Sequence, residues 1–256
     1  MINFTLFFNL FYMDQELQQL LCDMPEVVLL KPTTGSTNDD VKALIAQGTK
    51  TALVCSEIQT QGRGQHDRTW QSPQGNIYLS TIINTQRPID GRLSLEVALN
   101  LIHMPSLSHF KTLYIKWAND LYSPQGKWGG ILIEPISPHQ VVVGVGINVL
   151  PRAELQQLDQ AATSLSQLGL LEVSKIELIA QVYQAIQQAG QWFEHGSQNL
   201  AQRFNHVAMY KNEHVLFETN QTMVQGTFLG IQDDGAVLLQ TTSGIKTYYQ
   251  GRLRHA

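Results

Sequence analysis

The clearest strand of this sequence is Val141-Val142-Val143-Gly144-Val145-Gly146-Ile147-Asn148, a valine-rich run whose second half alternates with glycines and which ends in an amide. A continuous apolar run of this kind is typical of a buried strand. Outward from it, helical stretches alternate with short β-branched runs between Val27 and about Glu194, which indicates a mixed α/β domain. The pattern predicts strands over residues 51–57, 77–83, 113–117, 129–136 and 140–145, and helices over 38–47, 93–102 and 175–195.

The hydrophobic pattern of the sequence changes near Asn205, where the predicted helices end. Short alternating runs follow, separated by turn pairs such as Asp234-Gly235 and Ser243-Gly244, and they predict strands over residues 213–219, 223–231, 236–240 and 245–249. Such a meander makes a small barrel-like module that needs support from the first domain. We therefore divide the chain into an N-terminal extension with a helix (1–26), a large domain (27–204) and a small module (205–256).

Composition narrows the class of protein. The net charge of −4 over 256 residues gives no reason to expect a nucleic-acid-coating surface or a polybasic membrane anchor. The two cysteines, Cys22 and Cys55, form no C-x-x-C pair, which favours a reducing, cytoplasmic compartment. The apolar start, Met1 to Tyr12, lacks the basic region and cleavage site of a secretory signal, and the sequence leaves open whether translation begins at Met1 or Met13.

A glycine-rich loop carries the strongest chemical signal. Gly62 and Gly64 flank Arg63 directly after a predicted strand, so the backbone can approach a ligand while N–H groups and a guanidinium converge on an anion. Arg68 adds a second cation and Trp70 a flat apolar face. A lone G-x-G is more often an ordinary surface turn, but the spacing of Arg, Arg and Trp favours a binding loop here.

Three further clusters lie at the ends of predicted elements. They are Gly35-Ser36-Thr37-Asn38 before a helix, Lys116-Trp117-Ala118-Asn119-Asp120, and Lys127-Trp128-Gly129-Gly130 at the start of an apolar strand. Each has a plain structural alternative: a helix N-cap for Ser36 or Thr37, solvated strand ends for the two lysines, and a turn former for Asn148.

Taken together and in this order, the clusters resemble the catalytic domain of biotin–protein ligases. The resemblance covers most of the chain. The C-terminal segment, with Gly230-Ile231 and Asp234-Gly235-Ala236-Val237, resembles that family's SH3-like module. The resemblance to this family implies an α+β fold with a mixed-sheet catalytic domain of the biotin/lipoate ligase type and a small C-terminal SH3-like β-barrel.

The resemblance also implies roles for residues. Arg63 and Lys127 would be catalytic. The biotin site would comprise Ser36, Thr37, Asn38, Gln59, Arg63, Gly64, Gln65, Lys127, Gly129 and Gly130. The ATP and adenylate site would comprise Arg63, Arg68, Trp70, Lys116, Asn119, Asp120, Lys127 and Asn148.

The implied activity is a biotin–protein ligase that uses ATP and Mg²⁺ to make biotinyl-5′-adenylate and then biotinylates one lysine of the biotin carboxyl carrier protein of acetyl-CoA carboxylase. The metal ligands are unknown from the sequence. Neither nucleic acid nor membrane is an expected partner, and a homodimer through the edge of the central sheet is possible within the family. Arg252 and Arg254 could help to bind nucleotide or acceptor, or could be solvated terminal charges.

The sequence differs from the family's motifs at two positions, and two alternative functions stay open. The family usually has arginine directly after Gly-Arg-Gly, where this chain has Gln65, and proline where it has Ala118. The missing cation weakens the expected hold on the adenylate, because charge-assisted contacts are the stronger ones. Lipoate–protein ligase is the enzymatic rival. A biotin-responsive repressor is the rival from another class, although the residues before Gly35 are too few for a three-helix DNA-binding module.

Overall fold

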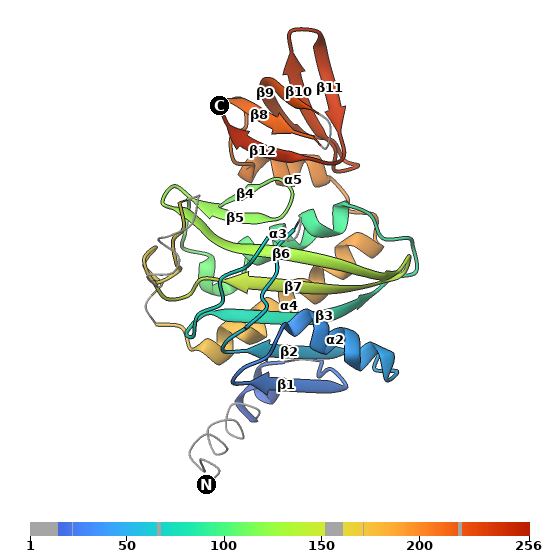
Figure 1. Cartoon of the computed structure of the whole chain (residues 1–256), viewed down its shortest axis with the longest axis vertical. Coiled ribbons are helices and arrows are strands. Elements are labelled where there is room, and N and C mark those ends of the chain that lie inside the picture. The colour runs from blue at the N-terminus through green and yellow to red at the C-terminus, as the bar shows by residue number, and fades with distance from the viewer. Residues whose placement is uncertain (1–14, 22, 66–67, 152–160, 171, 220–221) are drawn as a thin grey trace.

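A seven-stranded mixed sheet forms the centre of the molecule (Figure 1). The computed structural model describes residues 15–256 apart from positions 22, 66–67, 152–160, 171 and 220–221. The strand order is β1-β2-β3-β7-β6-β5-β4, in which β1 and β2 are parallel and the other neighbours antiparallel. The strands are β1 (Val27–Lys31), β2 (Ala52–Ser56), β3 (Ile77–Asn84), β4 (Tyr114–Lys116), β5 (Asp120–Ser123), β6 (Gly126–Ser137) and β7 (Gln140–Ile147).

The two faces of this sheet are covered differently. Alternate side chains point to opposite faces of a strand, so Leu53 belongs to the main core while its neighbour Val54 packs with Val41 of helix α2 (Thr37–Ala46). Helices α3 (Arg92–Ile102) and α4 (Lys175–Glu194) pack on each other over the main core. On the α2 face of β7, the residues after Val142 at every second position are Gly144 and Gly146, and a hollow replaces the core there.

A β-bulge interrupts β6 near its start. Tyr122 of β5 pairs with Lys127 and Leu121 pairs with Gly129, which leaves Trp128 as the extra residue. Trp128 is fully buried and donates its indole N–H to the carbonyl of Tyr122 (3.0 Å). Three residues apart on a regular strand would face opposite sides, so the bulge is what brings Lys127 and Gly130 to the same face.

The C-terminal segment folds into a second sheet above β4, shown in orange and red in Figure 1. Helix α5 (Leu200–Val207) leads into it, and its order is β11-β10-β9-β8-β12, all antiparallel. The strands are β8 (His214–Glu218), β9 (Met223–Ile231), β10 (Val237–Thr241), β11 (Gly244–Tyr248) and β12 (Arg252–His255). Trp117, in the β4–β5 turn, donates to the carbonyl of Gly235 (3.0 Å) and packs on Phe217.

The predicted α+β class with a mixed sheet and an SH3-like C-terminal module is confirmed. Most predicted elements are present with ends shifted by one to three residues, and a helical turn covers residues 15–20. Among the described residues, five elements were not predicted: β1, β5, β12, α5 and the short 3-10 helix η1 (Pro105–Leu107). The division between residues 204 and 205 stays a prediction, and α5 runs across it. Positions 1–14 lie outside the described residues.

Three smaller features bear on the sequence-based expectations. Cys55 is a buried free thiol, and burial raises its pKa to about 12. The peptide bond between Trp117 and Ala118 is cis. Among the described residues, no helix is both long and apolar enough to cross a membrane.

Candidate active site

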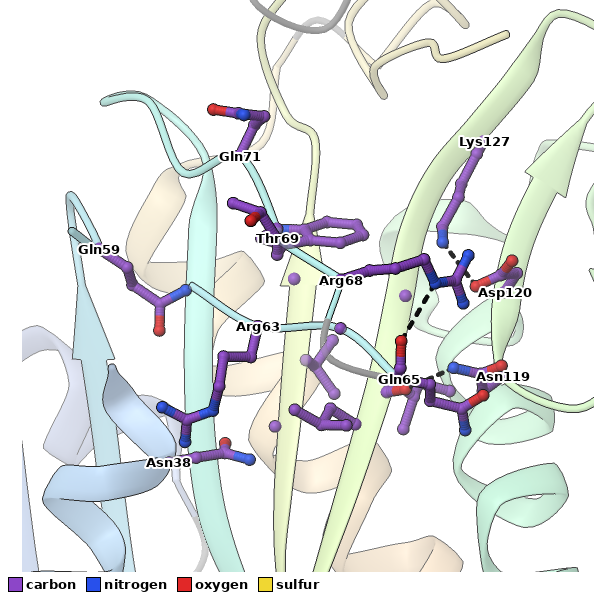
Figure 2. A pocket seen from close by; sticks show the side chains of 18 of the residues that line it. Asn38, Gln59, Arg63, Gln65, Arg68, Thr69, Gln71, Asn119, Asp120 and Lys127 are labelled. Carbon is purple, nitrogen blue, oxygen red and sulfur yellow. Dashed lines mark hydrogen bonds and ion pairs between the residues drawn. The ribbon is translucent and has the colours of Figure 1, made fainter. Parts of the chain in front are cut away.

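A cavity of about 460 Å³ opens on the α2 face of the sheet, where β3, β7 and β6 meet the loop after β2. Residues from α2, this loop, the three strands and β12 line it, so segments far apart in the sequence converge. The size lies within the usual range for small-molecule sites. The lining divides into a neutral end beside α2 and a cationic end toward β5 (Figure 2). Arg252 and Arg254 of the C-terminal module also line the cavity.

The neutral end is a chain of buried hydrogen bonds at the start of α2. Gln59 accepts from the backbone N–H and the hydroxyl of Thr37 (2.9 and 3.1 Å). The hydroxyl of Ser80 lies near both Thr37 Oγ1 (2.7 Å) and Asn38 Oδ1 (2.5 Å). Ser36, Thr37 and Asn38 are buried, and the Ser36 side chain makes no cap hydrogen bond in the described structure. These polar groups are therefore held in place before a ligand arrives.

Gly144 makes this end possible. A Cβ at this position would collide with the side-chain amide of Asn38, so only glycine lets β7 pass beside it. The Asn38 amide in turn donates to Glu134 of β6 (2.6 Å), which also pairs with Lys42 (2.8 Å). Asn38 is thus held between Ser80 of β3 and Glu134 of β6, on the α2 face of the sheet.

The glycine-rich loop folds back on itself across the cavity. The N–H of Gly64 donates to the carbonyl of Arg68 (2.7 Å), and the N–H of Trp70 donates to Gly62 (2.9 Å). A Cβ at Gly62 would lie 2.5 Å from the Trp70 carbonyl, so this close approach requires glycine. The predicted binding loop is thus a short hairpin with Arg63 and Thr69 paired opposite each other.

Arg63 and Arg68 leave this hairpin in different directions. Figure 2 shows Arg63 directed toward Asn38, and Arg68 toward Asp120 and Lys127. Arg63 makes a two-pronged ion pair with Asp39 (2.7 and 2.6 Å), which lowers the pKa of Asp39 and raises that of Arg63. In this conformation Arg63 ties the loop to α2, and Arg68 is the loop cation at the other end.

Trp70 forms the wall between the two ends. Its ring lies against Gly146, where a Cβ would come within 2.6 Å of the indole, and against Gly130. The Lys127 ammonium lies 5.1 Å from the ring centroid, a cation–π arrangement. In the described structure the buried indole N–H of Trp70 has no hydrogen-bond partner.

Lys127, Asp120 and Asn148 lie at the cationic end. Lys127 donates to Asp120 (2.5 Å), and both side chains are largely buried. Asn148 donates to the carbonyl of Thr163 (3.1 Å), while its buried side-chain oxygen has no partner among the described residues. Buried polar atoms are normally paired, so the free Asn148 oxygen and Trp70 N–H are positions where a ligand can hydrogen-bond.

The cavity gathers most of the residues predicted from sequence. They are Ser36, Thr37, Asn38, Gln59, Arg63, Gly64, Gln65, Arg68, Trp70, Asn119, Asp120, Lys127, Gly130 and Asn148. Gly129 and Lys116 are not among the lining residues. Gly129 faces Leu121 instead, because the bulge at Trp128 turns it away.

Lys116 lies in an adjoining hollow of about 290 Å³ beside the C-terminal module. Its ammonium lies 5.4 Å from the Tyr122 ring centroid. Burial lowers the Lys116 pKa to about 8, with nearby Arg252 and Lys127 adding to the effect. It is therefore a neighbour of the cationic end and not part of the cavity wall.

Sequence reasoning missed several contributors. Gly144 and Gly146 were seen only as the end of a strand, although their alternation with valines marks a face where side chains are excluded. Ser80 positions two predicted residues without lining the cavity. Arg252 and Arg254, which the sequence offered for nucleotide or acceptor binding or as solvated charges, line the cavity from β12, and it is this strand that was not predicted.

Comparison with known proteins places this geometry in a family. Residues 30–148 match the biotin/lipoate A/B protein ligase family, and residues 211–252 match the biotin protein ligase C-terminal domain. The bifunctional ligase/repressor BirA of Bacillus spizizenii is 29% identical over 207 residues, which cover 77% of this chain and 64% of the relative. The chain thus spans just under two thirds of that relative's length.

Two other similarities agree with this. The biotin–[acetyl-CoA-carboxylase] ligase of Mycobacterium tuberculosis is 36% identical over 146 residues, 54% of each chain. The structure of biotin protein ligase from Aquifex aeolicus in complex with biotin and ATP shares the fold, with a TM-score of 0.79, 24% identity, and coverage of 90% of this chain and 100% of that one. The central sheet, its loop and the C-terminal module together show that the chain belongs to the biotin/lipoate A/B protein ligase family, with the C-terminal domain of a biotin protein ligase.

Proposed function

We propose that this chain is a biotin–protein ligase that activates biotin with ATP and transfers the biotinyl group to a lysine of the biotin carboxyl carrier protein of acetyl-CoA carboxylase. The observation that carries the proposal is the two-ended cavity, in which fixed neutral hydrogen-bonding groups lead, past Trp70, to Lys127 and Arg68. Biotinyl adenylate has a neutral ureido group at one end and an anionic acyl phosphate toward the other. It would therefore fit a cavity that runs from a neutral end to a cationic end.

At the neutral end, Ser36, Thr37, Asn38 and Gln59 would bind the ureido group of biotin. The side chains of Thr37, Asn38 and Gln59 are already oriented by hydrogen bonds, so they lose little side-chain entropy when biotin binds. Gly64 and Gln65 would close over the ligand while Arg63 holds the loop to α2 through Asp39. A closed loop also protects a mixed anhydride from water.

At the cationic end, one carboxylate oxygen of biotin would attack the α-phosphorus of ATP as the bond to pyrophosphate breaks. Lys127 would lie between the two anions and offset their repulsion, and Arg68 would stabilise the charge that develops. Trp70 would pack against the adenosine, and the free side-chain oxygen of Asn148 would accept a hydrogen bond from it. In the second step the acceptor lysine attacks the acyl carbonyl, and AMP leaves.

We also propose that Mg²⁺ accompanies ATP. In nucleotide sites it is held by one or two carboxylates together with substrate phosphates, and Asp120 is the carboxylate among the described cavity-lining residues. When bound, the ion would offset phosphate charge. Asn119 would keep the segment before Asp120 in place, because its amide donates to the carbonyl of Ile131 (2.7 Å).

The proposal is tested by incubating the purified chain with labelled biotin, ATP and Mg²⁺, with and without a biotin carboxyl carrier domain, and with lipoate in parallel. We expect label on the carrier lysine with biotin and not with lipoate. Transfer of lipoate instead would favour a lipoate–protein ligase, and the absence of any biotin-dependent product would refute the proposal. A cytoplasmic location and a homodimer through the edge of the central sheet stay predictions.

A further inference from the structure

A carboxylate lies directly behind the neutral end of the cavity. Leu132 of β6 lines the cavity, and Glu134, two residues further on, lies on the same face of this strand. Glu134 accepts a hydrogen bond from the side-chain nitrogen of Asn38 (2.6 Å). Its carboxylate also pairs with Lys42 (2.8 Å) and Arg63 (3.6 Å). Glu134 is not among the described lining residues, so it can influence a ligand only through these neighbours.

Glu134 is ionised in this setting. Burial alone would raise its pKa, but hydrogen bonds from Lys42 and Asn38 lower the pKa below the ordinary glutamate value, as do the charges of Lys42 and Arg63. An ionised carboxylate accepts hydrogen bonds and has no proton to donate. The side-chain nitrogen of Asn38 therefore has to face Glu134, because the side-chain oxygen in that position would bring two acceptors together.

This contact sets the direction of the Asn38 amide. With the nitrogen on Glu134, the side-chain oxygen faces the hydroxyl of Ser80 (2.5 Å) and lies beside Gly144, which lines the cavity. An amide oxygen accepts two hydrogen bonds, so one beyond that from Ser80 can come from a ligand. Asn38 thus offers the cavity an acceptor.

The opposite orientation of Asn38 would reverse the chemistry of this end. The NH₂ group would then face Ser80 and the cavity, and a ligand would meet a donor in place of an acceptor. A cyclic urea has two N–H donors, whereas the dithiolane ring of lipoate has none. A site built to hydrogen-bond an N–H group discriminates strongly against a ligand that lacks it.

We infer that Glu134 is a positioning residue that sets specificity: it holds the Asn38 amide with its oxygen toward the cavity, so that the neutral end selects a ligand head with N–H donors. The identification of that head as the ureido group of biotin rests on the proposed function, whereas the orientation of Asn38 does not. Glu134 itself touches neither ligand nor reacting atoms.

The test is a double-substitution cycle in the full chain, read as KM for biotin and KM for ATP in adenylate formation. Glu134→Gln keeps the shape but can donate, so Asn38 can turn over, and KM for biotin should rise about ten- to hundredfold. Asn38→Asp brings two carboxylates together and should cause a similar loss. The double variant pairs a donor with an acceptor again and returns an oxygen to the cavity, so KM for biotin should recover to within about fivefold of wild type.

Two readouts separate this role from a merely structural one. KM for ATP and kcat should stay within about twofold of wild type in all three variants, because only binding of biotin is affected. Lys42→Gln is the matched control: it removes another partner of the same carboxylate at a similar distance and leaves Asn38 in place. Lys42 is about one-third exposed, so its loss should change KM for biotin less than about twofold.

An unchanged KM for biotin in Glu134→Gln, no recovery in the double variant, or an equal loss in Lys42→Gln would each overturn the inference. A thermal melt verifies that each variant is folded. The comparison of Asn38→Asp with the double variant remains decisive even if Glu134→Gln alone is unstable.

Failure of the proposed function looks different, since the wild type would then make no biotinyl adenylate. The side-chain amide signal of Asn38 in an NMR spectrum tests the inference without any ligand. This signal, identified by its loss in Asn38→Asp, should move in Glu134→Gln and stay in place in Lys42→Gln. A signal that does not move in Glu134→Gln would show that Glu134 does not orient Asn38.

Discussion

The two ends of the cavity are built on opposite principles. At the end beside α2, Thr37, Asn38, Gln59 and Ser80 satisfy one another through hydrogen bonds and carry no net charge. At the other end, the Trp70 N–H and the Asn148 oxygen lack partners in the described structure, and two lining arginines, Arg68 and Arg252, lack counter-ions. The first end is complete without a ligand, and the second is completed by one.

This difference indicates where specificity and reactivity reside. A preorganised neutral site discriminates by shape and hydrogen-bond geometry, because its groups cannot rearrange to suit another ligand. A site with unpaired charge binds anions strongly but with less selectivity for shape, and its strength falls with salt. Strand β7 has one glycine at each end of the cavity. Gly144 lies beside Asn38 at the neutral end, and Gly146 lies against the ring of Trp70.

The largest effect is expected at Lys127, which in the proposed reaction lies between the biotin carboxylate and the α-phosphate. Lys127→Gln should lower the rate of biotinyl adenylate formation by roughly 10²- to 10³-fold, as for loss of one preorganised electrostatic group. Pyrophosphate release with saturating biotin and ATP measures it, with Lys246→Gln, which removes a charge from an exposed position on the C-terminal module, as the control. A drop of less than about tenfold would place the charge stabilisation elsewhere.

The glycine pair on β7 tests the separation of the ends most directly. Gly144→Ala should push the Asn38 amide and weaken biotin binding, while Gly146→Ala should push the Trp70 ring and weaken nucleotide binding. Overpacking costs about 1–3 kcal/mol, so each affinity should fall by about tenfold or more. Titrating both variants with both ligands provides internal controls. If each variant weakens both ligands equally, the two ends are not separable.

Lys116 offers a test by pH, because it is a buried cation outside the cavity wall. Burial lowers its pKa to about 8 from the ordinary lysine value of 10.5, so the unfolded chain binds more protons between these values and the free energy of unfolding rises with pH in that window. Lys116→Met should be more stable than wild type near neutral pH, by on the order of 1 kcal/mol. Urea unfolding measured from neutral pH to about 10 should show this difference shrinking. A difference that is constant with pH would contradict the assignment.

The smallest effect is expected from the ion pair that ties the loop to α2. Asp39 is half exposed, so its pair with Arg63 is worth less than about 1 kcal/mol. The Arg63 guanidinium lowers the pKa of Asp39, so this stabilisation is present above the ordinary aspartate value and is lost as pH falls through the lowered one. Asp39→Asn should speed tryptic cleavage after Arg63 about two- to fivefold.

Asp90→Asn is the matched control for that experiment, since it removes a similarly exposed pair with Arg92 far from the loop in sequence. High salt should reproduce the Asp39→Asn effect in the wild type. Equal cleavage rates for the two variants would show that Asp39 does not restrain the loop.

The sequence predicted the parts of the site that lie in contiguous motifs, and it failed where geometry depends on pairing. The β7 run, the Gly-Arg-Gly loop and the Ser-Thr-Asn helix start were all recognisable, because local periodicity and glycine spacing are visible in one dimension. The orientation of Gly129 was not, since a bulge appears only when β6 is aligned with β5.

The position of Lys116 outside the cavity wall has the same cause. Lys116 belongs to the same motif as Asp120, yet it lies across a hairpin turn and points into the neighbouring hollow. For Arg252 the sequence left two readings open, nucleotide or acceptor binding and a solvated terminal charge, because β12 is too short for its alternation to be noticed. Its place beside Arg68 is set by how the two sheets meet, which no local pattern encodes.

The contact of Trp117 with the C-terminal sheet has a thermodynamic consequence. One hydrophobic cluster includes Leu121 and Trp128 of the central sheet together with Phe217 and Leu253 of the second sheet. Surface buried jointly by two segments stabilises neither when they are separated, so the molecule should melt as a single cooperative unit with one calorimetric peak. A protease that cut between the two sheets would therefore release two unstable fragments and not a working ligase core.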